Sequence, residues 1–135
     1  MILLLQGQSD IGRITLAEKI ASEVDQWRHV PVESLLETPV FQMIQGDIDE
    51  ELLLGLAVHL ARELAGEGFH TVLTYPDASE HIPAIKKELG DSFCAVHLME
   101  EENKSPCDHV IITKDKSVND LFALIRNIFK SAPST

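Results

Sequence analysis

Residues 1–16, MILLLQGQSDIGRITL, decide the fold that we predict for this chain. The segment Ile2–Leu5 is a short apolar run, which is typical of a buried strand when turn residues bound it. Gly7 ends the run, and four residues separate it from Gly12. From Ile14 onward the apolar residues recur at helical spacing. The stretch therefore predicts a strand, a glycine-bounded loop and a helix in direct succession.

The loop has the pattern G-x-x-x-x-G-R-I-T, which is close to the phosphate-binding pattern G-x-x-x-x-G-K-[ST]. In such a loop successive backbone N–H groups surround an anion, and the first turn of the helix adds further donors and a positive dipole end. We expect the glycines to permit the backbone dihedral angles that this requires. The candidate phosphate or nucleotide site consists of Gly7, Gln8, Ser9, Asp10, Ile11, Gly12, Arg13, Ile14 and Thr15. The alternative is an ordinary strand-to-helix turn that binds nothing.

Two departures from the pattern fall on the residues that carry its chemistry. Arg13 stands where a lysine normally reaches the outer phosphates, and its guanidinium is charged but longer and planar. Ile14 stands where a hydroxyl normally holds magnesium, and it offers the ion no ligand. Thr15 comes one residue late, about 100° further round the helix. We expect Arg13 to begin the helix at the surface and to contact phosphate.

Apolar runs and helical patterns alternate along the rest of the chain. We predict further strands at residues 29–32, 69–75, 93–98 and 109–113. Such alternation predicts a three-layer α/β domain with helices on both faces of the sheet. No repeat or linker interrupts the pattern, so we expect one domain over residues 1–130 and a disordered tail over 131–135.

The long middle helix and the first helix have the clearest apolar stripes. We predict a capping box of Asp47 and Glu50 at the start of the long helix. Its predicted buried stripe is Leu52, Leu53, Leu56, Ala57, Leu60 and Leu64. The stripe of the first helix runs from Ile14 to Trp27, and we interpret Trp27 as a core or edge anchor.

The order of elements resembles that of the P-loop small-molecule kinases. The first loop, the first helix and residues 108–125, DHVIITKDKSVNDLFALI, are most similar to the adenylylsulfate kinases. The resemblance covers most of the chain in layout, but it is specific only in the first loop. It implies a central parallel five-stranded sheet in the order 2-3-1-4-5, with ATP as phosphate donor and magnesium as cofactor.

In these kinases a carboxylate near the end of the strand at residues 69–75 helps to hold magnesium. Thr74 occupies the matching position here, and Asp77 follows three residues later. Asp77 either reaches the metal region, as a catalytic residue together with Arg13, or caps the next helix. We favour the cap because Asp77 and Glu80 have capping-box spacing. No protein metal site is therefore predicted with named ligands.

The resemblance also implies an acceptor site and a lid. Glu33 and Glu37 lie in the region that shapes the acceptor site in the family, and we interpret both as solvated surface carboxylates. The lid of these kinases carries arginines that close over the transferring phosphate, and one such arginine contributes roughly 10³–10⁵ in rate. The matching residues 99–108, MEEENKSPCD, contain three consecutive glutamates, one lysine and no arginine.

Composition excludes several classes of partner and compartment. The formal net charge of −11 argues against nucleic-acid binding, which needs a basic face. No apolar run approaches the roughly 20 residues that span a bilayer, and MILLL lacks the length and basic lead of a signal peptide. Cys94 and Cys107 are too few for a disulfide framework. We therefore expect a cytoplasmic protein without a membrane partner.

The leading interpretation is a kinase-like P-loop domain that binds a nucleotide or a small phosphorylated molecule, with reduced or lost phosphotransferase activity. One alternative is an active ATP-dependent small-molecule kinase with an unusual site, in which Arg13 clamps phosphate and Asp77 holds magnesium. The other is an interaction protein that has the same fold and binds no nucleotide. Sequence does not decide among these, nor does it indicate an acceptor or an oligomeric state.

Overall fold

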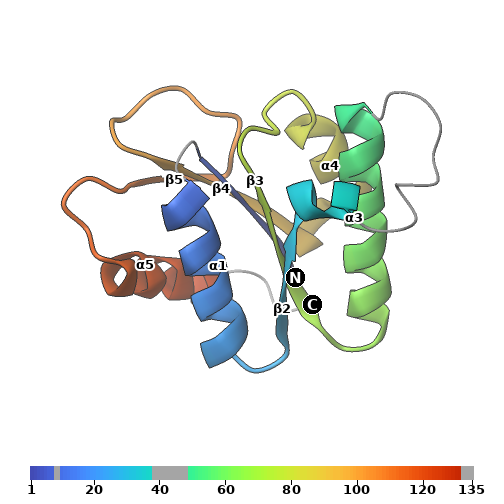
Figure 1. The fold of residues 1–135 in the computed structure, drawn as a ribbon, viewed down its shortest axis with the longest axis horizontal. Coiled ribbons are helices and arrows are strands. Elements are labelled where there is room, and N and C mark those ends of the chain that lie inside the picture. The colour runs from blue at the N-terminus through green and yellow to red at the C-terminus, as the bar shows by residue number, and fades with distance from the viewer. Residues whose placement is uncertain (8–9, 38–48, 132–135) are drawn as a thin grey trace.

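Five parallel strands form one sheet at the centre of the molecule (Figure 1). The computed structural model describes residues 1–7, 10–37 and 49–131. The strands are β1 (Ile2–Gln6), β2 (Trp27–Pro31), β3 (His70–Tyr75), β4 (Phe93–Met99) and β5 (His109–Ile112). Their order is β2-β3-β1-β4-β5, and each neighbouring pair is parallel. The predicted fold class and strand order are therefore confirmed.

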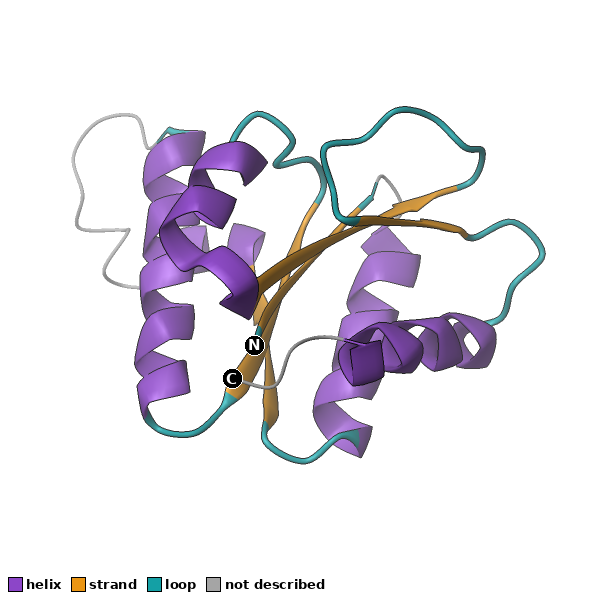
Figure 2. Ribbon diagram, turned by 180° about the vertical axis from the view of Figure 1, so that it is seen from behind, coloured by secondary structure: helices purple, strands orange, loops and turns teal. Residues whose placement is uncertain are grey.

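Helices cover both faces of the sheet, which gives the three expected layers (Figures 1 and 2). The helices are α1 (Asp10–Glu23), α3 (Glu50–Gly66), α4 (Ile82–Leu89) and α5 (Val118–Ser131), with short 3-10 turns η1 (Val32–Glu37) and η2 (Gly90–Ser92). Alternate residues of β1 enter different cores, because successive side chains of a strand point to opposite faces. Ile2 and Leu4 pack with α3 and α4, whereas Leu3 and Leu5 pack with α1 and α5.

Helix α3 buries a different face from the one that the leucine spacing predicts. Leu52 and Leu60 are 42% and 38% exposed. The buried residues of the helix are Leu53, Leu54, Ala57, Val58 and Ala61. Leu53 and Ala57 belong to both the predicted stripe and the buried face, and Leu56 and Leu64 are partly buried against the core. The buried face is therefore rotated by about one residue position from the predicted stripe, which is wrong at Leu52 and Leu60.

The ends of two predicted helices also differ from the sequence interpretation. The N-cap of α3 is Asp49, whose carboxylate accepts a hydrogen bond from the backbone N–H of Leu52 at 2.8 Å. The proposed cap Asp47 lies outside the described residues. Helix α1 ends at Glu23, so Trp27 begins β2 instead of ending the helix. Trp27 is nevertheless a buried anchor, and its ring stacks on that of Phe129 with centroids 4.5 Å apart.

Within the part of the chain that the structure describes, no helix is long and apolar enough to cross a membrane. Of the predicted tail, Ser131 is the last residue of α5, and residues 132–135 lie outside the described residues.

Candidate functional site

A cavity of about 420 Å³ lies at the carboxyl end of the sheet, where β1, β4 and β5 all stop. Gly7, Gly12 and Arg13 border it on the side of the first loop. Thr113 and Lys116 border it from the segment that follows β5. Open α/β sheets bind ligands outside the carboxyl ends of their strands, and a cavity of this size suits a small molecule.

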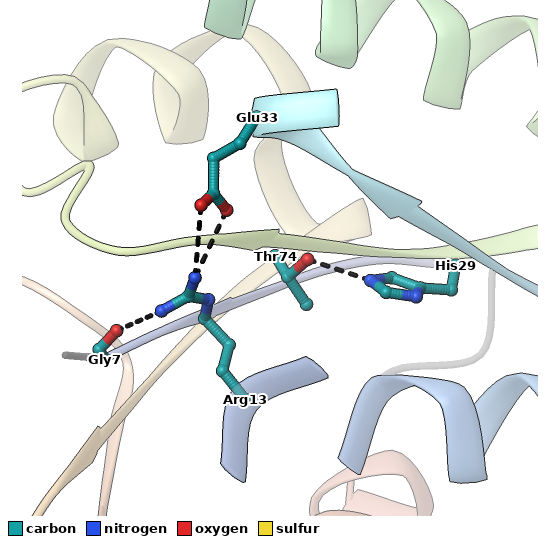
Figure 3. A network of polar contacts seen from close by, with 5 residues as sticks. All are labelled: Gly7, Arg13, His29, Glu33 and Thr74. Carbon is teal, nitrogen blue, oxygen red and sulfur yellow. Dashed lines mark hydrogen bonds and ion pairs between the residues drawn. The ribbon is translucent and has the colours of Figure 1, made fainter. Parts of the chain in front are cut away.

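Arg13 is fully buried at this edge, contrary to the expected surface position. Its Nη1 donates to the backbone carbonyl of Gly7, and its Nη2 donates to Glu33 Oε1 at 3.2 Å and Oε2 at 3.4 Å (Figure 3). The burial follows from helical spacing, because Arg13 lies three and four residues before the buried Leu16 and Ala17 and shares their face. The charge is tolerated inside because a carboxylate lies beside it.

Glu33 is therefore not the solvated surface carboxylate that the sequence predicts. It lies in the first turn of η1, directly after the fully buried Val32. This position aims its carboxylate across the edge of the sheet at Arg13, and its side chain stays 40% exposed. Glu37, at the other end of η1, is exposed as expected.

The first loop is described only in part. Gln8 and Ser9 lie outside the described residues, as do the side chains of Asp10 and Ile11, so an anion nest of backbone N–H groups stays a prediction. Ile14 is half-buried and Thr15 is exposed. Gly12 lies within α1.

Position 7 requires glycine for a steric reason, and not for the backbone dihedral angles that the sequence suggests. Its φ lies outside the left-handed region, so an unusual dihedral angle is not the reason. A Cβ added at Gly7 would lie 2.6 Å from the carbonyl oxygen of Leu98, on the neighbouring strand β4. The glycine is required because the two backbones approach closely, and a conformational argument from the sequence alone misses this contact.

Gln6 is a site residue that the sequence interpretation missed. Its side chain is fully buried, its Oε1 accepts from the Ala78 N–H at 2.9 Å, and its Nε2 donates to Ser79 Oγ at 3.0 Å. The same Nε2 lies 3.3 Å from His97 Nδ1, and burial lowers the pKa of that histidine. Gln6 thus ties the segment after β3 to β1 and β4. The sequence feature that could have identified Gln6 is an amide side chain at the end of an apolar run, directly before Gly7.

Asp77 does not cap helix α4. The N-cap of α4 is His81, which makes no side-chain capping bond, so the predicted capping box is wrong. Asp77 instead accepts from the Ser79 N–H at 3.0 Å, a local turn that competes with capping. Its hydrogen bonds with Ser79 lower the pKa of Asp77, which keeps the exposed carboxylate charged.

Thr74, at the position of the metal-organising carboxylate, is fully buried and lies 2.8 Å from His29 Nε2 through its hydroxyl (Figure 3). Burial lowers the pKa of His29, and the nearby Glu18 offsets part of that effect. The structure thus pairs Thr74 with a histidine of β2. Over the described residues no group of three or more histidine, cysteine, aspartate or glutamate side chains is arranged to hold a metal ion.

A second polar cluster lies beyond the end of β3 and was also missed. The Tyr75 hydroxyl donates to Glu50 Oε2 at 2.9 Å, and Glu50 Oε1 lies 3.0 Å from His81 Nε2. Burial and the hydrogen bond to Glu50 raise the pKa of Tyr75 to about 12, so the phenol keeps its proton. These residues are far apart in sequence, and no local pattern indicates that they meet.

Comparison with known proteins gives fold neighbours but no sequence relatives. No model of a protein family matches the chain, and no curated protein sequence matches it. A hexameric APS kinase from Thiobacillus denitrificans has a TM-score of 0.74 at 11% identity, covering 96% of this chain. This chain spans only 28% of the length of that protein.

Two further neighbours match along their whole length. An APS kinase from Mycobacterium tuberculosis, CysC, has a TM-score of 0.71 at 18% identity, covering 96% of this chain and 97% of its own. A sugar kinase from Janibacter sp. has a TM-score of 0.64 at 16% identity, covering 98% of this chain and 95% of its own. The expected resemblance to adenylylsulfate kinases is therefore confirmed at the level of the fold: the chain has the fold of the P-loop small-molecule kinases.

Proposed function

We propose that this chain is a kinase-like domain that binds a nucleotide or a small phosphorylated molecule, with reduced or lost phosphotransferase activity. The observation that carries the proposal is the cavity of about 420 Å³ at the carboxyl end of the sheet. It is bordered on one side by Gly7 and Gly12, the two glycines of the phosphate-binding pattern, and by Arg13, which stands at the position of its lysine. The kinase fold makes ATP the first nucleotide to test.

Three features support weak or absent catalysis. The guanidinium of Arg13 already contacts a carbonyl and a carboxylate, so a ligand phosphate competes with these partners for it. Ile14 supplies no oxygen to magnesium, which prefers such ligands. The connection from β4 to β5 carries Glu100, Glu101 and Glu102 and no arginine, although phosphoryl transfer depends on positioned positive charge. Magnesium is therefore a weak cofactor in this proposal.

The proposal includes a cytoplasmic location and no nucleic-acid partner. The two cysteines, Cys94 and Cys107, are unbridged, which agrees with a reducing compartment. The net charge of −11 disfavours polyanions in general, so a nucleotide has to be held by local geometry at the cavity.

Calorimetric titration with ATP, with and without magnesium, tests the proposal together with a phosphotransfer assay. We expect binding that magnesium improves little, and turnover near background. Arg13→Ala should weaken binding by about 1.5–3 kcal/mol, the range for hydrogen bonds to charged groups. Arg62→Ala is the matched control, because Arg62 is exposed on α3, away from the cavity.

Two other results would replace this proposal with one of its alternatives. Magnesium-dependent binding with turnover supports an active kinase, and loss of that turnover in Asp77→Asn would identify Asp77 as its metal-holding residue. Absence of ATP, ADP and phosphate binding supports an interaction protein on the same fold.

A further inference from the structure

The ion pair of Arg13 and Glu33 lies at the border of the cavity. Arg13 lines the cavity, whereas Glu33 does not. The Arg13 side chain is fully buried, and the side chain of Glu33, whose carboxylate holds it, is 40% exposed. Arg13 therefore contacts both the cavity, which it lines, and the carboxylate of Glu33, to which Figure 3 shows it bonded.

A phosphate and a carboxylate bind a guanidinium in the same way. Both accept hydrogen bonds from its planar fork of N–H donors, and they compete because the number of donors is fixed. Arg13 Nη2 donates to both carboxylate oxygens of Glu33, at 3.2 Å and 3.4 Å, and Nη1 donates to the Gly7 carbonyl. A phosphate that approaches from the cavity side therefore competes with these partners for the N–H groups of Nη1 and Nη2.

We propose that Glu33 is an affinity-determining residue that competes with the ligand phosphate for Arg13 and keeps the site in a low-affinity state. The inference rests on the proposed function, since it needs an anionic ligand at the cavity. A pair that holds the guanidinium in nine of ten molecules weakens the apparent affinity about tenfold, because only the remaining fraction is competent to bind.

The opposite role for Glu33 predicts the opposite sign. A carboxylate that orients Arg13 toward the ligand would strengthen binding, and its removal would weaken binding. The sign of the change in affinity therefore separates competition from positioning.

The test is calorimetric titration of the full chain with inorganic tripolyphosphate and with ATP, both without magnesium. Glu33→Gln keeps the shape of the side chain and removes its charge. We expect it to bind both probes about tenfold more tightly than the unmodified chain. In the Arg13→Ala background the same substitution should change nothing. Glu37→Gln, the same charge change at an exposed position of the same 3-10 turn, should also change nothing.

Thermal unfolding of each variant shows whether it is folded before it is titrated. If Glu33→Gln does not fold, Glu33→Asp replaces it, because the shorter carboxylate loosens the contact and should give a smaller gain in affinity. Equal or weaker binding by a folded Glu33 variant overturns the inference while the proposed function stands. A gain that persists without Arg13 also overturns it. Failure of every variant to bind either probe removes the proposed function itself.

Discussion

Arg13 combines a full charge with complete burial, and side chains in that situation depend on close partners. At the surface position that the sequence predicts for Arg13, Arg13→Ala would leave the fold almost unaffected, but the structure buries the side chain. We now expect the substitution to lower the free energy of unfolding by about 1.5–3 kcal/mol, since charged hydrogen bonds to Gly7 and Glu33 are lost. Chemical denaturation measures this change in the free energy of unfolding.

The matched control is Arg62→Ala. Arg62 and Glu88 form an ion pair at 3.0 Å whose side chains are 58% and 54% exposed, so its loss should cost less than about 1 kcal/mol. An equally small loss for Arg13→Ala would mean that the contacts of Arg13 add nothing to folding stability.

His29 makes a second residue-scale prediction, on pH. Burial lowers its pKa in the folded chain below the ordinary value of about 6.5, so the unfolded chain binds more protons below that pH. The free energy of unfolding should therefore fall as the pH decreases from 7.5 to 5. His29→Gln should make that fall shallower in chemical denaturation at several pH values.

The control for His29→Gln is His59→Gln, the same substitution at an exposed position on α3. Identical profiles for His29→Gln and the unmodified chain would show that His29 has no part in the acid sensitivity.

The burial of Arg13 could be predicted from the sequence, but its partner could not. Its spacing to Leu16, Ala17 and Ile20 is helical, and all four are buried on one face of α1. The phosphate-binding pattern at the same residue favours a surface position instead, and the two interpretations conflict. Its partner Glu33 could not be found, because the contact joins the first turns of α1 and η1 across the edge of the sheet. Only the tertiary structure brings them together.

At the scale of elements, the close approach of β1 and β4 leads to a test on the first loop. Gly7→Ala puts a methyl group 2.6 Å from the backbone carbonyl oxygen of Leu98, so part of the backbone has to move. We expect a loss of about 1–3 kcal/mol in the free energy of unfolding, the usual cost of overpacking.

Gly55→Ala is the matched control for Gly7→Ala. Gly55 lies within α3, and an added Cβ meets no atom within 4 Å. Because alanine favours helix over glycine, this variant should gain about 0.5–1 kcal/mol. A Gly7→Ala protein as stable as the unmodified chain would show that the first loop adapts without cost.

The sequence predicted the elements better than their faces. Short apolar runs bounded by turn residues located all five strands. The run in β1 is continuous because that strand is buried on both faces, whereas the edge strands β2 and β5 are partly exposed. In α3 both the leucines and the alanines recur at helical spacing, so more than one face could be buried. The structure buries Leu54, Val58 and Ala61 in place of Leu52 and Leu60. Spacing alone does not contain that information.

At the scale of the whole molecule, fold and site follow different constraints. The sheet order and helix layers match those of kinases at only 11–18% identity, since many apolar sequences can fill such a core. The chemistry depends instead on a few residues at the carboxyl edge of the sheet, and here those residues differ from the kinase pattern. A shared fold therefore does not predict catalysis, which has to be tested at the site.

The decisive test restores the kinase pattern in the complete molecule. Arg13→Lys with Ile14→Ser supplies the compact ammonium and the hydroxyl that the phosphate-binding pattern contains. For the unmodified chain we expect magnesium to improve ATP affinity by less than about twofold. For the double variant we expect about tenfold, which corresponds to about 1.4 kcal/mol. Arg13→Lys with Ile14→Val controls for the lysine without the hydroxyl.

The double variant should still turn over below about 1 per second, the lower end for kinases, because no arginine lies in the connection from β4 to β5. Restored binding without restored turnover would locate the remaining defect in that acidic connection. Turnover of about 1–100 per second by the unmodified chain would contradict the proposed loss of activity. The metal would then be held by a group other than residue 14, and Asp77, the charged carboxylate beyond β3, is the first to replace with asparagine.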